Sequence, residues 1–238
     1  MTLRAVIFDW GGTLSSYADV DMSDMWRMAA RRMAPDREDE VCAALVAAEA
    51  ASWDRIALDR RSTQLRSILE IASGQLRLNL ADIALDEAAT SHLDAWTPHV
   101  RHDGQAVDAL RQLRSRGLRI GLLSNTHWPR SFHEHFLVRD GLAPLIDTRS
   151  YTSEMPYTKP HPSAFVSVLR ALGVAATEAI FVGDRPFDDI HGAQSVGMRT
   201  ILRPNAAVPD YEVHPDAVVN SLDEVVQVVD SWRGHERS

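Results

Sequence analysis

Short apolar runs and amphipathic segments alternate along most of this chain. Unbroken apolar runs of this length are typical of strands that are buried on both faces of a sheet. They cover residues 5–8, 118–123, 179–182 and 199–202. Amphipathic segments at helical spacing lie between and after them, at residues 104–116, 129–138, 162–172, 189–196 and 222–232. This alternation predicts an α/β fold with a parallel sheet, flanking helices and right-handed crossovers.

Residues 20–96 break the alternation. Stretches such as DEVCAALVAAEAASWDRIA place apolar residues at helical spacing, and no convincing strand interrupts them. The segment ends at Thr97-Pro98, because the residue before a proline disfavours the helical conformation. We therefore expect an α/β core formed by residues 1–19 and 97–238, and an all-helical domain formed by residues 20–96.

Composition limits the classes of partner and the compartment. The formal net charge of −8 argues against a nucleic acid or an anionic membrane as the general partner. Cys42 is the only cysteine, so no internal disulfide can form, and this fits a reducing compartment. No signal-like segment and no run of about twenty apolar residues occurs. We expect a cytoplasmic protein that is either a monomer or a homodimer.

Polar residues stand where the predicted strands end. Asp9 follows the first strand, Ser124 and Asn125 follow the second, and Asp184 follows the third. Lys159, the only lysine of the chain, opens the helical segment before that third strand. Ligands of open parallel sheets bind beyond the carboxyl ends of the strands, so we expect these side chains to converge.

The expected cluster suits phosphoryl transfer. Asp9 can act as a nucleophile that forms an aspartyl phosphate, or as a ligand of Mg²⁺ together with Asp184 and a backbone carbonyl of the glycine turn. Lys159 would pair with the nucleophile and with phosphoryl charge, while Ser124 and backbone amides hold the oxygens. A single aspartate at a strand end is often only a turn or cap residue, so the combination carries this interpretation.

The segments FDWGGTL, LLSNT, TKPHPSAF and FVGDRPFDDIHGAQSVGM stand in the order of the four motifs of the haloacid dehalogenase superfamily. The sequence strongly resembles that superfamily over residues 4 to about 203. The resemblance implies a Rossmann-like core, with residues 20–96 in the place of the superfamily's cap domain. It also implies a role for each matched residue: Asp9, Lys159 and Ser124 in catalysis, Gly12, Thr13 and Asn125 in phosphate binding, and Asp9, Gly11, Asp184 and Asp189 in holding Mg²⁺.

Gly11 departs from the superfamily's phosphatases, which carry there a second aspartate that protonates the leaving group and later activates water. The Gly11 carbonyl can still bind Mg²⁺, but glycine has no proton to give. Such acid/base assistance is worth about 10² to 10⁴ in rate. His127 is a candidate replacement, since an imidazole shuttles protons near neutral pH, although a solvated or helix-capping histidine is the more common case.

The leading hypothesis is therefore a Mg²⁺-dependent phosphatase of a small phosphorylated metabolite. Gly11 motivates one alternative, a catalytically impaired protein that binds a phosphorylated ligand or partner. A metal-independent 2-haloacid dehalogenase is another, although the intact Gly183-Asp184 pair favours a magnesium site. Phosphonoacetaldehyde hydrolases have a similar first motif but need a cap lysine, and residues 20–96 contain none. Candidate substrate-contacting residues of the helical domain are Trp26, Trp53, Arg55, Arg60 and Arg61.

Overall fold

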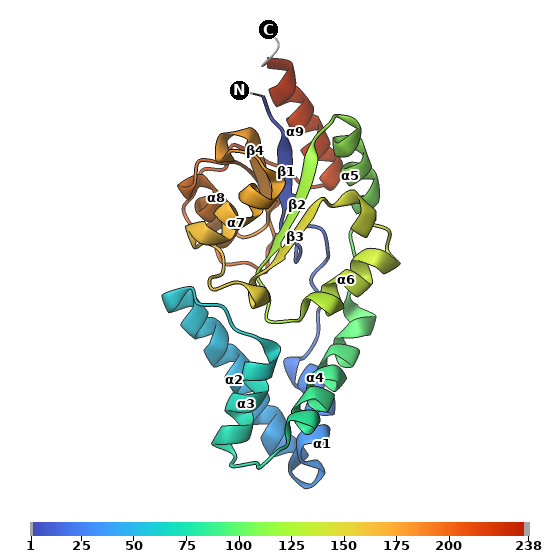
Figure 1. Cartoon of the computed structure of the whole chain (residues 1–238), viewed down its shortest axis with the longest axis vertical. Coiled ribbons are helices and arrows are strands. Elements are labelled where there is room, and N and C mark those ends of the chain that lie inside the picture. The colour runs from blue at the N-terminus through green and yellow to red at the C-terminus, as the bar shows by residue number, and fades with distance from the viewer. Residues whose placement is uncertain (1, 236–238) are drawn as a thin grey trace.

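The computed structural model describes residues 2–235 and confirms a parallel α/β sheet (Figure 1). Within these residues the sheet has six strands in the order β3-β2-β1-β4-β5-β6, all paired in parallel. The strands are β1 (Ala5–Phe8), β2 (Arg119–Ser124), β3 (Thr148–Tyr151), β4 (Ala179–Gly183), β5 (Arg199–Leu202) and β6 (Ala217–Val218). The strand order reverses beside β1, so the ends of β1, β2 and β4 border the crevice where such sheets bind ligands.

Alternate residues of the strands enter two separate hydrophobic clusters, one on each face of the sheet. Phe8 and Val182 lie in the cluster covered by α5 (Ala106–Ser115), α6 (Arg130–Arg139) and α9 (Leu222–His235). Their neighbours Ile7 and Phe181 lie in the cluster covered by α7 (Pro162–Leu172) and α8 (Gly192–Ser195). Both faces of the sheet are therefore buried under helices, and this explains why the sequences of these strands are unbroken apolar runs.

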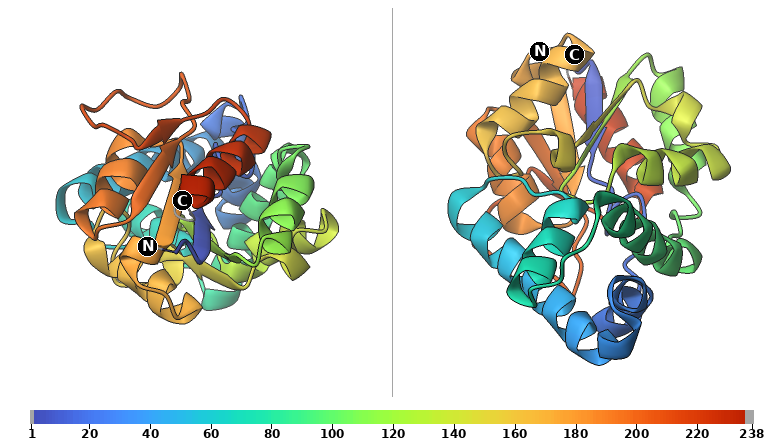
Figure 2. Two further views of the ribbon diagram at one scale, coloured as in Figure 1. Left: turned by 90° about the horizontal axis from the view of Figure 1, so that it is seen from above. Right: turned by 60° about the horizontal axis from the view of Figure 1, so that its bottom comes forward.

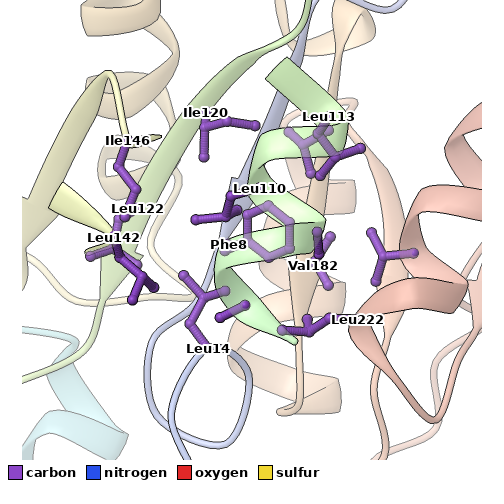
Figure 3. Packing of buried hydrophobic residues seen from close by; sticks show 14 of the residues in the cluster. Phe8, Leu14, Leu110, Leu113, Ile120, Leu122, Leu142, Ile146, Val182 and Leu222 are labelled. Atoms are coloured by element: carbon purple, nitrogen blue, oxygen red, sulfur yellow. The ribbon is translucent and has the colours of Figure 1, made fainter. Parts of the chain in front are cut away.

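The α5 side of the core is shown from close by in Figure 3. Leu110 and Leu113 of α5 point at Phe8 and Ile120 of the sheet, and all four side chains are fully buried. Leu222, at the start of α9, and Val182 of β4 belong to the same hydrophobic cluster. The carboxyl-terminal helix thus helps to cover this face of the sheet.

Four of the α-helices between β1 and β2 form an insertion with a hydrophobic cluster of its own. They are α1 (Met22–Met33), α2 (Glu38–Asp59), α3 (Leu65–Gln75) and α4 (Asp82–Trp96). The insertion lies beyond the carboxyl ends of the strands, at the opposite end of the molecule from both termini (Figures 1 and 2). The proposed domain boundaries at residues 20 and 96 stay a prediction. None of the described helices is both long and apolar enough to cross a membrane.

Two strands and the form of one helix were not expected from the sequence. The edge strand β3 reads TRSY, and only Tyr151 in it is fully buried, so no apolar run marks it. The second unexpected strand, β6, has only two residues. The single helix expected over residues 189–196 is instead a π-helical turn, Pro186–His191, followed by the short helix α8. That turn places Asp189 toward the end of β4, where the side chain takes part in the site.

Replacing Leu110 by alanine tests the packing of α5 on the sheet. Leu110 is fully buried, so we expect Leu110→Ala to lower the free energy of unfolding by about 2–5 kcal/mol. Leu58 of α2 is 86% exposed, and Leu58→Ala serves as the matched control, with an expected change within about 0.5 kcal/mol. Urea-induced unfolding followed by circular dichroism measures both. Equal effects of the two substitutions would contradict this account of the core.

Candidate active site

The predicted site residues do converge at the carboxyl ends of the central strands. Asp9 directly follows β1, Ser124 ends β2, and Asp184 directly follows β4. Lys159 lies in the loop before α7, and its Nζ donates to Asp9 Oδ1 and to Asp189 Oδ1, both at 2.6 Å. All five side chains are buried. The lysine thus stands between two carboxylates that come from distant parts of the chain.

The site holds three buried carboxylates and a single buried amine. Oxygen atoms of Asp9, Asp184 and Asp189 all lie within 4.8 Å of one another. Burial raises the pKa of Asp9, against the lowering effect of Lys159, and burial followed by the charges of Asp9 and Asp189 raises the pKa of Asp184. Burial alone would lower the pKa of Lys159, but the two carboxylates that it contacts outweigh burial and raise it. The ammonium therefore stays charged, and the cluster carries excess negative charge.

The free oxygen of the cluster belongs to Asp184. Its Oδ1 is buried and has no hydrogen-bond partner, while its Oδ2 accepts only a long bond of 3.3 Å from Asn205 Nδ2. Both oxygens of Asp189 are engaged, Oδ1 by Lys159 and Oδ2 by the backbone N–H of Arg185 at 3.0 Å. Hard divalent cations prefer such carboxylate oxygens and would compensate the excess charge. The cluster can therefore hold a divalent cation, with Asp9 and Asp184 as its available ligands.

The two glycines after Trp10 differ in what the fold demands of them. Gly12 has a φ of +80°, and a Cβ there would lie 2.3 Å from Asp184 Oδ2 and 2.6 Å from a ring carbon of Tyr17. The φ of Gly11 lies outside the left-handed region, and the nearest atom to a Cβ there would be a Tyr17 ring carbon at 4.0 Å. Gly12 is thus required by the backbone and by Asp184, whereas the space beside Gly11 would admit a side chain.

The other predicted phosphate-binding residues have different surroundings. Thr13 Oγ1 is buried and has no hydrogen-bond partner, but Thr13 is not among the residues that line the cavity, so its contact with a phosphate stays a prediction. Asn125 uses its side-chain amide on the backbone of Lys159: Nδ2 donates to the Lys159 carbonyl at 3.0 Å, and Oδ1 accepts from the Lys159 N–H at 2.9 Å. Asn125 therefore positions the lysine, and its contact with a phosphate stays a prediction.

A cavity of about 800 Å³ lies between these residues and the helical insertion. The core contributes Asp9, Ser124 and Lys159 to its lining, and α2 contributes Glu49 and Trp53. Among the candidate substrate-contacting residues, Trp53 and Arg60 line the cavity, and Trp26 lies instead inside the hydrophobic cluster of the insertion. Arg55 and Arg61 are not among its lining residues. A small molecule can therefore touch both parts of the protein at once.

The insertion is tied to the core beside Lys159. The Ser62 N–H donates to the Pro156 carbonyl at 3.1 Å, and the Thr158 N–H donates to the Arg60 carbonyl at 2.9 Å. The Leu65 N–H donates to the His127 carbonyl at 2.7 Å. The loop between α2 and α3 thus holds the segment that precedes Lys159.

His127 is neither solvated nor a helix cap, so both common explanations of this residue are wrong. Its side chain is buried and lines the cavity, and neither ring nitrogen has a hydrogen-bond partner. Burial lowers the pKa of His127 to about 4, so the ring is neutral near pH 7. Its Nε2 lies 3.4 Å from Oε1 of Glu49. The sequence marks His127 only by its place after a strand. In the structure it lies in the wall of the cavity, and its ring has no hydrogen-bond partner.

Sequence reasoning also missed several residues that shape the site. The Tyr17 ring lies beside Gly12, and its hydroxyl is within hydrogen-bonding reach of Arg185. Tyr17 precedes the insertion at a place without any motif, so no sequence signal marks it. Glu49 did carry a signal, since it lies on the same stripe of α2 as the buried residues Leu45 and Ile56. An acid on a buried helical stripe calls for a partner or a function.

Trp10, next to Asp9, is held by a chain of hydrogen bonds. Its Nε1 donates to His102 Nε2 at 3.0 Å, and His102 Nδ1 lies 2.7 Å from Asp140 Oδ2. This pattern requires the proton of a neutral His102 to sit on Nδ1, where it is donated to the carboxylate. The Trp10 ring belongs to the hydrophobic cluster on the α5 side of the sheet.

The family model for haloacid dehalogenase-like hydrolases matches residues 3–197. This chain belongs to that family. It is 30% identical over 125 residues to a glyceraldehyde 3-phosphate phosphatase of Methanocaldococcus jannaschii, a match that covers 52% of this chain and 54% of the relative. It is 37% identical over 126 residues to a phosphoserine phosphatase of Thermus thermophilus, covering 51% and 48%. The chain thus spans about half the length of these curated relatives.

Solved structures of the family share the fold. A 2-haloacid dehalogenase from Pseudomonas syringae pv. Tomato DC3000 superposes with a TM-score of 0.69 at 23% identity, over 97% of this chain and all of that one. At this identity the likeness concerns the fold alone. The family membership explains why the four motifs converge as the haloacid dehalogenase-like hydrolases arrange them.

Alanine substitutions at the two glycines test the site geometry. We expect Gly12→Ala to lower the free energy of unfolding by at least about 1–2 kcal/mol, because alanine resists a positive φ and its Cβ would overlap the Asp184 carboxylate. Gly11→Ala should leave stability unchanged, since its Cβ meets no atom closer than 4.0 Å. Thermal unfolding of the two variants distinguishes them. A larger loss for Gly11→Ala than for Gly12→Ala would refute the assignment.

Proposed function

We propose that this hydrolase is a Mg²⁺-dependent phosphatase of a small phosphorylated metabolite that acts through an aspartyl phosphate at Asp9. The observation that carries the proposal is the pairing of a buried carboxylate at the end of β1 with the only lysine of the chain, beside an unpaired Asp184 oxygen. A small phosphorylated ligand fits the cavity, and neither a nucleic acid nor a membrane is needed as a partner. We place the protein in the cytoplasm on the grounds of its composition.

In the first step an oxygen of Asp9 attacks phosphorus, and the bond from phosphorus to the ester oxygen breaks. Lys159, which already contacts Asp9 Oδ1, orients that carboxylate and offsets the charge of the incoming phosphoryl group. The leaving group departs with the electron pair of the broken bond. In the second step water attacks phosphorus, releasing inorganic phosphate and restoring the Asp9 carboxylate.

Mg²⁺, when bound, would be held by Asp9, Asp184 and the Gly11 carbonyl, with Asp189 in support, and would stabilise negative charge on the phosphoryl oxygens. Asp189 is the supporting member because both of its oxygens already accept hydrogen bonds. Ser124 and Thr13 are buried hydroxyl groups near the same strand ends, and they would donate to the phosphoryl oxygens.

The excess negative charge of the cluster favours this function over a metal-independent 2-haloacid dehalogenase. Such an enzyme has no use for a third carboxylate whose Oδ1 is buried without a partner. Gly11 keeps a second candidate open, a protein that binds a phosphorylated ligand with little turnover. The two candidates share the site and differ only in the rate of the chemical steps.

Turnover of 4-nitrophenyl phosphate with Mg²⁺ tests the proposal. We expect measurable hydrolysis that a chelator abolishes, and a fall of about a thousandfold or more in Asp9→Asn, which lacks the nucleophile. Asp108→Asn, at a side chain of α5 that is 75% exposed, is the control and should match the wild type. Tight binding of beryllium fluoride with no turnover would instead establish the binding protein. Halide release from a 2-haloacid in the presence of chelator would establish the dehalogenase.

The absence of a carboxylate at Gly11 predicts a steep dependence on the leaving group. Aryl and acyl phosphates should react much faster than alkyl phosphates, and the aspartyl phosphate should accumulate, because no positioned acid or base assists either step. Gly11→Asp should raise the turnover of alkyl phosphates most, by up to about 10² to 10⁴. Gly11→Asn, which has a similar shape but no acid, is the control.

Steady-state rates over a series of leaving groups, together with acid-quench trapping of the phosphoenzyme, provide the measurement. Wild-type rates that do not respond to the leaving-group pKa, combined with no trapped intermediate, would mean that another acid already serves the site.

A further inference from the structure

The wall of the cavity formed by the insertion contains a buried carboxylate without a cationic partner. Glu49 of α2 is 8% exposed and lines the cavity. Its Oε2 accepts a hydrogen bond of 2.7 Å from Trp26 Nε1, and the Trp53 indole also lies within hydrogen-bonding reach. In the part of the chain that the structure describes, no lysine or arginine pairs with Glu49. Burial raises the pKa of this carboxyl, so its charge is costly in the free protein.

His127 faces Glu49 but does not neutralise the charge of its carboxylate. His127 Nε2 lies 3.4 Å from Glu49 Oε1, yet neither ring nitrogen makes a hydrogen bond. Because the ring is neutral near pH 7, one of its nitrogens offers a lone pair and the other offers an N–H. His127 therefore has one acceptor nitrogen without a hydrogen-bond partner in the wall of the cavity, beside the Glu49 carboxylate.

Aromatic rings surround this pair. The Trp53 ring lies 5.5 Å from the His127 ring, and the Trp128 ring lies 6.0 Å from it on another side, as measured between ring centroids. Trp96 lies 5.1 Å from Trp128. All of these rings line the same cavity. A carboxylate among indole rings is the environment that binds an ammonium group, through ion pairing and cation–π attraction.

Another part of the cavity wall holds the proposed phosphate site. Lys159 and Arg185 line it beside Asp9 and Ser124, where a phosphate would bind if the proposed function holds. A ligand that extends from there to the insertion thus meets Lys159, Arg185 and the nucleophile at one end, and at the other a carboxylate without a cationic partner among aromatic rings. Electrostatic complementarity then selects a ligand with a phosphate at one end and a positive charge at the other.

We propose that the substrate is an aminoalkyl phosphate, whose ammonium group binds Glu49 Oε1 and the acceptor nitrogen of His127 among Trp53, Trp96 and Trp128. The proposal rests on the proposed function for the phosphate end, and the ammonium site stands on Glu49 and His127 alone. A bound ammonium gives Glu49 the counterion that it lacks and gives His127 a hydrogen-bond partner. A phosphate ester with an uncharged alkyl chain would leave Glu49 without a counterion and His127 without a hydrogen-bond partner.

Matched ligands test the ammonium site. The inhibition constants of 3-aminopropyl phosphate and propyl phosphate against 4-nitrophenyl phosphate turnover give the two affinities, and quenching of tryptophan fluorescence gives them without any turnover. We expect the amine to bind at least about tenfold more tightly than propyl phosphate in the wild type. Glu49→Gln keeps the acceptor for Trp26 but removes the charge, so it should abolish the preference and leave propyl phosphate binding unchanged.

Glu40→Gln is the control on the same helix, at a side chain that is 53% exposed, and should keep the preference. Equal binding of the two ligands by the wild type would overturn the proposal. Equal weakening of both ligands in Glu49→Gln would also overturn it, since that pattern means a structural role. If fluorescence shows the preference while no phosphate ester turns over, the proposed function fails and the ammonium site stands.

Discussion

The contact of Lys159 with Asp9 and Asp189 is the interaction on which the site depends. It joins the end of β1, the loop before α7 and the π-helical turn after β4, three segments far apart in the chain. Burying these charges is costly, and only close pairing repays it, so removing one partner from such a group typically costs about 3–5 kcal/mol. The lysine balances only part of the negative charge of the cluster, and the unpartnered Oδ1 of Asp184 makes the cluster suitable for a cation.

The surrounding structure holds that contact in place from two sides. Asn125 binds both backbone polar groups of Lys159, and the loop between α2 and α3 binds the backbone just before it. Arg203 Nη1 donates to the Thr13 carbonyl at 2.7 Å and Nη2 pairs with Asp103, which ties the first loop to β5. The helical insertion thus does two things: it lines one side of the cavity, and it helps to position Lys159.

Family membership and local structure together explain why Gly11 is of interest. Gly12 is constrained by its positive φ and by Asp184, whereas the fold leaves room for a side chain at Gly11. The lack of a side chain at this position is therefore not imposed by packing. Packing does not account for Glu49 and His127 either. Both are polar side chains at buried positions, where packing alone would favour apolar residues.

The sequence by itself determined the parallel α/β core, the helical insertion and the convergence of Asp9, Ser124, Lys159 and Asp184. These follow from local signals, since buried parallel strands read as apolar runs and their carboxyl ends meet at one edge. Only the tertiary structure decided which distant residues become partners, such as Glu49 with His127 and Trp10 with His102. It also revealed β3 and β6. The sequence does not mark them, because β3 is a half-polar edge strand and β6 has only two residues. Contacts between segments this far apart in the chain depend on how the helices pack on the sheet. The spacing of residues within a single segment does not encode this packing.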